Sequence, residues 1–370
     1  IQTKATLERN AGNINDFANS IRAMRRHEIE RIGLAWMSGV IDDEASLAGM
    51  TDVYDAAIEA SLQWAIQHRI NDIQIDEAPA AIAIIGMGRY GGREVNFSSD
   101  ADVIIIYRPA EGADDDQANL FARKVQEDLR AILQGPTTFE PKIELDMDLR
   151  PEGKNGPLVR SYASCEEYYR SWASTWEHQA LLRARYAAGD ASLAEDFLMN
   201  IADPLRYPKI DLTETQIAEI RKLKARMEAE RLPRGVRRDR HLKLGKGGLS
   251  DVEWTIQLLQ LQHAGDNANL RVNGTLQALN ELEHRKLISA GDAVVLRKAW
   301  RMCTAARNGS YLWSGRVNQA DILPDDSYSL GGIAVYLGYD ANRGQHFEND
   351  LLAVIRKARD VTERLFYGRS

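Results

Sequence analysis

The chain has 370 residues, 44% of them hydrophobic, so it is long enough to bury a substantial core and to form two or three subdomains. Its 54 acidic and 47 basic residues give a formal net charge of −7, which argues against broad nucleic-acid binding. No apolar run approaches the roughly 20 residues of a membrane span, and no signal peptide is evident, so we expect a cytoplasmic protein without membrane association.

Helical periodicity is typical of the first part of the chain, residues 1–76. Apolar residues recur at helical spacing in two runs: Ile29, Ile32 and Trp36, then Tyr54, Ile58, Leu62 and Ala65. The chain begins at Ile1 without a Met and enters a polar helical pattern at once. We therefore expect an N-terminal helical segment, in a piece of a longer protein.

An apolar run at residues 78–85 gives way at Gly86 to a glycine-rich turn, and a second apolar run follows at 103–107. The pattern predicts strand, turn, strand. Glycines allow backbone N–H groups to approach a phosphate closely. Asp100 and Asp102 stand two residues apart at the head of the second strand, so both carboxylates project from one face. A phosphate cradle beside such acids can hold Mg²⁺ against a triphosphate, as a nucleotidyltransferase requires.

The glycine-rich turn and its acids could also indicate a dinucleotide-binding site or a solvated strand edge. A dinucleotide-binding site would need a helix directly after the glycines and an acid about 20 residues further on; here a second strand follows instead. The Asp-x-Asp pair by itself is also typical of a solvated strand edge. Glycine turn, paired acids and a further acidic strand together favour the metal site.

That further strand is the alternating run 143–149, with apolar and acidic residues at period two. Glu144, Asp146 and Asp148 share one of its faces. We expect the central Asp146 to complete a site for two metal ions, which would serve an in-line displacement at phosphorus. A helix at 117–133, with Phe121, Val125, Leu129 and Ile132 on one face, precedes this strand.

Helices are predicted to resume at Cys165. Trp172, Trp176 and His178 follow, and the pattern favours core packing for the tryptophans and a structural role for the histidine over that of a general base. Arg183 and Arg185 come next; the sequence leaves open whether they pair with phosphate or anchor structure. Cys165 and Cys303 lie far apart without metal-ligand spacing, so we expect packed thiols in a reducing cytosol.

The last part of the chain, 208–370, is predicted to be a helical bundle. Thr213 with Gln216, and Ser250 with Glu253, have the spacing of capping boxes, whereas Asp251 has no such explanation. Thr275 opens another helix, and the last runs over 348–367 with Leu351, Ile355, Ala358, Val361 and Leu365 inward.

A basic stretch lies within this part, made of Arg231, Arg234, Arg237, Arg238, Arg240, Lys243 and Lys246. A solvated loop is one interpretation, since charge runs are usually solvated. The glycines after Lys243 resemble a P-loop but lack its Gly-Lys-Ser/Thr, so a Walker ATPase is not expected. Our hypothesis is that this loop folds over the active site, where Lys243 or Lys246 contacts phosphate.

Four blocks carry a family resemblance: GMGRYGGREVNFSSDADVIIIY from Gly86, LDMDLRPEGKNGPLV from Leu145, TWEHQALLRARYAAGD from Thr175 and KLGKGGLSDVEW from Lys243. In this order they resemble the glutamine synthetase adenylyltransferases, two-headed bacterial enzymes with an N-terminal removase half and a C-terminal transferase half. The block from Thr175, with Arg183 and Arg185, is similar to the transferase half, and the chain's end resembles the family's C-terminus.

The resemblance implies an α+β fold. A polymerase-β-like nucleotidyltransferase domain at 77–207, with a small mixed sheet and helices, would follow the helical segment 1–76 and precede the bundle 208–370. It also implies residue roles. Asp100, Asp102 and Asp146 fall on the metal carboxylates, with two Mg²⁺ ions, for which Mn²⁺ can substitute, and ATP as substrate. The expected phosphate-binding residues are Gly88, Arg89, Gly91, Gly92, Ser98, Ser99, Lys243 and Lys246.

Two positions depart from the family pattern. Arg89 stands where the polymerase-β-like superfamily has Ser, so a basic side chain would replace the hydroxyl contact to phosphate. Asp148 stands where family members commonly have Arg, which leaves Arg150 as the one arginine of that strand.

The implied function is transfer of AMP from ATP to a tyrosine of glutamine synthetase with release of pyrophosphate, in the control of nitrogen metabolism. Two alternatives stay open: the removase half, which splits the adenylyl–tyrosine bond with phosphate to give ADP, and a non-catalytic module that docks on glutamine synthetase or a PII signal protein. Three converging carboxylates argue against the last, because without metal they repel one another. Glutamine synthetase is the expected protein partner, with a PII-type protein and glutamine as effectors of the full-length enzyme. We expect the C-terminal helices to dock glutamine synthetase, unless they only complete the core.

Overall fold

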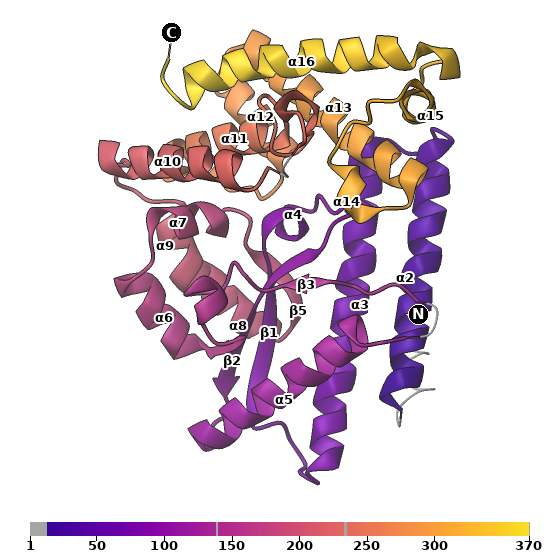
Figure 1. Cartoon of the computed structure of the whole chain (residues 1–370). Helices are drawn as coiled ribbons and strands as arrows, with labels where there is room; N and C mark the ends of the chain where they lie inside the picture. The colour runs from indigo at the N-terminus through magenta and orange to yellow at the C-terminus, as the bar shows by residue number, and fades with distance from the viewer. Residues whose placement is uncertain (1–12, 138–139, 233–234, 370) are drawn as a thin grey trace. The chain divides into compact units, whose positions relative to one another are not determined.

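The computed structural model describes residues 13–137, 140–232 and 235–369 (Figure 1). Its contacts divide the chain into two compact units. The first, which we call the sheet unit, runs to Val95 and resumes over Ser99–Leu205. The second, the helical unit, combines Asn96–Ser98 with the residues from Arg206 onward. The three-part division at 76/77 and 207/208 stays a prediction.

The sheet unit begins with two long helices, α2 (Ile14–Met37) and α3 (Asp43–Asp72), which pack along each other (Figure 1). Each starts where a side chain caps a free backbone N–H: Asn13 Oδ1 accepts from Asn15 at 2.9 Å and Asp42 Oδ1 from Ala45 at 2.8 Å. The predicted helical periodicity ahead of the first strand is therefore confirmed over these bounds.

The sheet is small and mixed, with strand order β3-β2-β1-β5. β1 (Ala80–Gly86) pairs antiparallel with β2 (Ala101–Pro109) on one side and with β5 (Arg185–Gly189) on the other. β3 (Leu145–Asp146) and β4 (Val159–Ser161) both run parallel to β2, β3 beside its first residues and β4 beside residues 105–107. The start of β2 is thus flanked by the end of β1 and by β3.

Both faces of the two central strands are buried, as their unbroken apolar runs require. α5 (Asp115–Gln134) packs against β1 and β2 through the predicted face. The remaining elements of this unit are α6 (Tyr162–Ser171), α7 (Thr175–Leu181), α8 (Ala191–Asp196), the π-helix η2 (Phe197–Ala202), the short α4 (Gly88–Gly91) and the 3₁₀ turn η1 (Gly153–Asn155). The helix α9 (Asp203–Arg206) spans the boundary, since Arg206 is assigned to the helical unit. Residues of α6, α7, α8 and η2 form one core with alternate residues of β1 and β2.

The helical unit contains α10 (Glu214–Glu230), α11 (Leu249–His263), α12 (Thr275–His284), α13 (Ala290–Ser314), α14 (Val317–Ala320), α15 (Ser327–Tyr336), α16 (Gly344–Leu365) and the 3₁₀ turns η3 (Arg238–Arg240), η4 (Ala268–Leu270) and η5 (Ala341–Arg343). α13 packs against α11, α12, α14, α15 and α16. It is the central helix of the unit, which explains its buried face along most of its length.

The α+β prediction, a small mixed sheet with helices before it and a helical bundle after it, is confirmed. Among the described helices, none combines the length and the apolar character needed to cross a membrane. Both cysteines are buried, as expected, and burial raises the pKa of the Cys165 thiol to about 12.

Three local predictions had different outcomes. The capping box at Thr213 and Gln216 is confirmed. The one at Ser250 is wrong, because the N-cap of α11 is Gly248, two residues earlier, which places Ser250 inside the helix. The prediction that Trp172 packs in the core is also wrong: it is the C-cap residue that follows α6, and it is 76% exposed.

Candidate functional site

The glycine-rich turn folds as a single helical turn, α4, between β1 and β2. The Met87 N–H donates to the Asp102 carbonyl at 2.8 Å, which fixes the turn against the head of β2. Gly88 has a φ of +52°, a conformation that favours glycine, and a Cβ at this position would overlap the Asp102 carboxylate. The sequence therefore needs glycine here so that backbone and carboxylate can lie against each other.

The rest of the turn is fixed by packing. A Cβ on Gly91 would overlap the Arg183 carbonyl, so packing by itself requires a glycine at this position. The Arg185 guanidinium lies over the Tyr90 ring at 4.8 Å, and it donates to the Tyr90 carbonyl at 3.1 Å and to Asp55 at 2.8 Å. These contacts hold α4 in place from β5 and α3.

The two arginines left open by the sequence are both engaged inside the sheet unit. Arg183 forms an ion pair with Glu94 at 3.2 Å, and both side chains are buried. Arg185 anchors α4 as described. The structure therefore favours the anchoring role for both. Tyr90, Glu94 and Asp55 were missed by sequence reasoning, because their partners lie far away along the chain.

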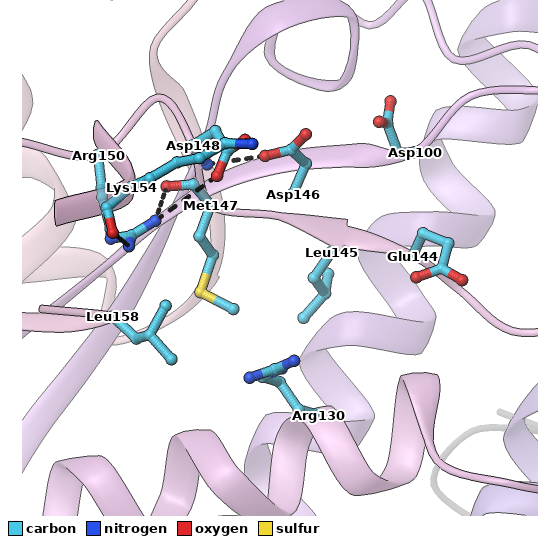
Figure 2. A pocket seen from close by; sticks show the side chains of 10 residues that line it. All are labelled: Asp100, Arg130, Glu144, Leu145, Asp146, Met147, Asp148, Arg150, Lys154 and Leu158. Atoms are coloured by element: carbon cyan, nitrogen blue, oxygen red, sulfur yellow. Dashed lines mark hydrogen bonds and ion pairs between the residues drawn. The ribbon is translucent and has the colours of Figure 1, made fainter. Parts of the chain in front are cut away.

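The predicted metal carboxylates stand at the head of β2 and on β3. Asp100 directly precedes β2 and is exposed, whereas Asp102 within β2 and Asp146 within β3 are half-buried. The parallel register places Asp102 opposite Asp146. In Figure 2 the carboxylates of Asp100 and Asp146 point the same way, and Leu145 and Met147 point the opposite way. The expected alternation of burial is present, although β3 is only two residues long.

The donor chemistry of these residues suits Mg²⁺, which prefers carboxylate oxygens. Gly88 leaves space beside the Asp102 carboxylate that any side chain would fill. In the part of the chain that the structure describes, however, no three His, Cys, Asp or Glu side chains are gathered closely enough to hold a metal ion. The residues fit the metal in kind and by strand register, but they do not form one preassembled ligand set.

A cavity of about 500 Å³ opens beside these acids (Figure 2). Its lining residues are Asp100, Arg130, Glu144, Leu145, Asp146, Met147, Asp148, Arg150, Lys154 and Leu158. Acidic and basic side chains therefore share its wall, and Lys154 pairs with Asp148 at 3.2 Å.

Arg150 organises the loop that follows β3. Its guanidinium is buried and donates to three backbone carbonyls, those of Met147 at 2.7 Å, Gly156 at 3.0 Å and Lys154 at 3.1 Å. Its hydrogen-bonding groups are therefore used within the loop. The geometry gives this arginine a structural role.

The predicted phosphate-binding serines flank the unit boundary. The Ser98 N–H and hydroxyl both donate to Asn96 Oδ1 at 3.2 Å, within the helical unit. The Ser99 carbonyl accepts from the Tyr54 hydroxyl at 3.1 Å, within the sheet unit. Both residues are thus held by neighbours that the sequence pattern did not identify. Arg89 and Gly92 lie in the α4 turn, so the structure brings them, Gly88 and Gly91 to the head of β2.

Lys243 and Lys246 belong to the helical unit. Lys246 is exposed and Lys243 half-buried. Although burial opposes ionisation of Asp321, the charges of Arg307 and Lys243 lower the pKa of that carboxyl. The basic stretch is not uniformly solvated, because Arg240 is buried and donates to the Leu323 carbonyl at 3.1 Å and to Glu348. Arg234 lies outside the described residues.

Asp251 has an explanation that the sequence did not provide. It is 0% exposed and accepts from Lys224, also 0% exposed, from Arg359 at 2.9 Å and from the Gly247 N–H at 2.7 Å. It therefore fastens the glycine-rich loop after Lys243 to α10 and α16. Lys224 follows Ile217 and Ile220 at helical spacing. A lysine on the apolar face of a helix was the sequence signal that could have indicated a buried charge pair.

His178 is half-buried in α7, and burial lowers its pKa below the ordinary value, with Glu177 opposing that effect. The imidazole is therefore neutral at pH 7. Because a neutral imidazole is also the form that accepts a proton, this pKa does not distinguish a structural role from that of a general base, and the structural role stays a prediction.

Comparison with known proteins identifies the sequence family over most of the chain. A family model described as glutamate-ammonia ligase adenylyltransferase matches residues 2–200. A second model, described as GlnD PII-uridylyltransferase, matches residues 220–366. The first match contains α4, β2 and β3, and the second contains most of the helical unit.

Individual relatives agree with the first model. The chain is 78% identical over 370 residues to the bifunctional glutamine synthetase adenylyltransferase/adenylyl-removing enzyme of Bifidobacterium longum strain DJO10A, covering 100% of this chain and 34% of that protein. It is 44% identical over 345 residues to the protein of the same description from Mycobacterium tuberculosis strain H37Rv, covering 93% of this chain and 34% of the relative. The chain thus spans about a third of the length of these curated relatives.

Proposed function

The chain belongs to the glutamate-ammonia ligase adenylyltransferase family, and from this premise we propose that it transfers AMP from ATP to a tyrosine hydroxyl of glutamine synthetase. This family is one of nucleotidyltransferase enzymes that regulate glutamine synthetase, which implies the use of ATP and metal in general. The observation that carries the proposal is the register of Asp102 against Asp146 on adjacent strands, beside the turn at Gly88.

In the proposed reaction, the tyrosine oxygen attacks the α-phosphorus of ATP as the bond from that phosphorus to the bridging oxygen breaks. The electron pair leaves with pyrophosphate, and the phenolic proton passes to Asp146. Backbone N–H groups of the turn at Gly88, with Arg89, hold the phosphates. Asp100, Asp102 and Asp146 would hold Mg²⁺, which when bound would supply positive charge that offsets the charge of the triphosphate.

The block from Thr175, with its similarity to the transferase half, supports transfer over removal. The basic residues Arg89, Lys243 and Lys246 also offer charge for a triphosphate, which is more anionic than phosphate. The removase reaction is the alternative, because the same acids serve a displacement in which tyrosine leaves. A non-catalytic docking role is the other alternative.

The proposal extends to the longer protein. We place the nucleotidyltransferase domain at 77–207 and the bundle at 208–370, with glutamine synthetase as protein substrate and a cytoplasmic location. A PII-type protein and glutamine would be its effectors. The match of residues 220–366 to a model described as a PII-uridylyltransferase supports a relation to PII signalling.

The experiment uses two incubations of the 370-residue chain. The first contains unmodified glutamine synthetase, Mg²⁺ and α-labelled ATP, and we expect label on the synthetase. The second contains adenylylated synthetase and phosphate, and we expect no ADP. ADP in the second with no label in the first would show that the wrong half has been assigned.

The control is a pair of single variants, Asp100→Asn and Asp102→Asn. Each should abolish labelling while thermal unfolding stays cooperative, because losing transition-state stabilisation of several kcal/mol lowers the rate by orders of magnitude. Near-normal labelling by a chain carrying both substitutions would exclude the proposed metal site.

A further inference from the structure

Three residues just before the predicted catalytic strand belong to the helical unit. Asn96–Ser98 groups with that unit, whereas Val95 and Ser99 on either side belong to the sheet unit. Only Ser98 and Ser99 separate Phe97 from Asp100 along the chain. Phe97 is therefore held in the helical unit only three residues before Asp100 of the sheet unit.

The segment is a compact turn that projects Phe97. The amide oxygen of Asn96, a residue that is 1% exposed, accepts from the Ser98 N–H and hydroxyl, which closes the turn. Phe97 is 6% exposed, and its ring lies parallel to the Tyr311 ring on α13, with centroids 6.1 Å apart and planes 4° apart. Offset-stacked aromatic pairs of this kind contribute beyond the area that they bury.

The residues on either side of this turn, Val95 and Ser99, both contact side chains of α3 within the sheet unit. The Val95 N–H lies 3.4 Å from Thr51 Oγ1, and the Tyr54 hydroxyl donates to the Ser99 carbonyl at 3.1 Å. Beyond Asp100, the Ala101 N–H donates to the Glu144 carbonyl at 2.8 Å. The backbone around Asp100 is thus fixed on both sides, and the Phe97–Tyr311 pair supplies one of these fixed points.

We propose that Phe97 is a positioning residue for Asp100, and that its stacking on Tyr311 makes α13 of the helical unit part of what sets the metal affinity of the site. The proposal rests on the proposed function, because it takes Asp100 as a metal carboxylate. It assigns Tyr311 a role in metal binding although this residue lies on a helix remote from Asp100 in sequence. Anything that shifts α13 would change metal affinity through this pair.

The experiment measures Mn²⁺ binding by electron paramagnetic resonance, without ATP and without turnover, on the 370-residue chain. Phe97→Leu and Tyr311→Leu each remove one ring, and we expect each to weaken Mn²⁺ binding by about tenfold, the upper range for an aromatic pair. Tyr311→Phe keeps the ring and should bind Mn²⁺ as the parent does. The double variant that carries both Phe97→Leu and Tyr311→Leu should bind Mn²⁺ no more weakly than either single variant does.

The control for general loosening of the helical unit is Tyr339→Leu, which breaks another ring pair of that unit, Tyr339 with Phe347 at 5.6 Å. It should lower thermal stability and leave Mn²⁺ affinity unchanged. Equal weakening by Tyr339→Leu would overturn the positioning role, and so would normal binding in both ring-deletion variants.

Asp100→Asn separates this inference from the proposed function. If Asp100→Asn loses Mn²⁺ binding while both ring-deletion variants keep it, only the positioning role is wrong. If Asp100→Asn binds Mn²⁺ normally, the proposed metal site fails and the inference fails with it.

Discussion

At the residue scale, the backbone of Gly88 and the carboxylate of Asp102 occupy adjacent space, so the turn and the predicted metal site constrain each other. A side chain at Gly88 meets two separate costs. One is the positive φ, which costs about 1 kcal/mol for an L-residue. The other is displacement of the Asp102 carboxylate from its position facing the turn.

Gly88→Ala separates these two effects when compared with Gly112→Ala. Gly112 also has a positive φ, +77°, but open space around its Cβ position. We expect Gly112→Ala to lose about 1 kcal/mol of unfolding free energy in urea, and Gly88→Ala to lose more, because overlap with the Asp102 carboxylate adds to the cost of the positive φ. Only Gly88→Ala should also lose Mn²⁺ binding and AMP transfer. Equal AMP transfer by the two variants would contradict a role for Asp102 beside the turn.

Local patterns predict which glycines and acids form the candidate site, because spacing along one strand decides which side chains share a face. Arg185 shows the limit of such patterns. Its partner Asp55 is 130 residues away, and no spacing rule connects them. Arg150 is a second case, since backbone carbonyls are its acceptors and these have no sequence signature.

At the element scale, β3 shows how side chains end a strand earlier than the pattern predicts. The alternating run suggested a strand over 143–149, yet pairing covers only Leu145–Asp146. Asp146 Oδ1 accepts the Asp148 N–H at 2.7 Å, and Arg150 draws the following carbonyls into a loop. These hydrogen bonds take the place of pairing with β2. The predicted alternation of burial is therefore correct, whereas the predicted length of the strand is not.

The helix start at α11 was misplaced for a related reason. Ser250 and Glu253 have the spacing of a capping box, but the buried Asp251 must face Lys224 and Arg359. That orientation requires residues 249–251 to be helical, with Gly248 as N-cap. Buried charge pairing overrode the local capping signal.

Asp251→Asn is predicted to destabilise the helical unit by about 3–5 kcal/mol, because it removes the buried carboxylate that pairs with the buried Lys224 and the half-buried Arg359. The exposed Asp360→Asn on α16 is the matched control and should change stability by less than about 0.5 kcal/mol. Urea unfolding of both variants measures the difference. Equal stability of the two would show that the charge cluster contributes nothing.

The same carboxylate predicts a pH dependence. Burial by itself raises the pKa of Asp251, but the charges of Lys224 and Arg359 outweigh it and lower the pKa below the ordinary value. A carboxyl with a lowered folded-state pKa stabilises fully above its unfolded pKa of about 4, and that stability is lost as pH falls further. The gap between parent and Asp251→Asn should therefore be constant from pH 7 to 5 and close below about pH 4.

At the scale of the whole molecule, the predicted ligands of one reaction are divided between two units. Asp100, Asp102 and Asp146 belong to the sheet unit, and Lys243 and Lys246 to the helical unit. Sequence patterns predicted both groups and the fold class of each part. They did not reveal that Asn96–Ser98 belongs with the helices, since residues of that unit such as Tyr311, which stacks on Phe97, lie over 200 residues away along the chain.

This division predicts two separable responses in hydrogen exchange. Mn²⁺ alone should slow exchange at residues 86–102 and 144–148, since the proposed metal carboxylates lie there. ATP added with Mn²⁺ should also slow exchange at residues 241–250, because triphosphate charge attracts Lys243 and Lys246. Lys243→Ala with Lys246→Ala should lose the second response and keep the first. Lys298→Ala, an exposed lysine on α13, should keep both. ATP-dependent protection of 241–250 that survives in the double variant would disprove phosphate contact by this loop.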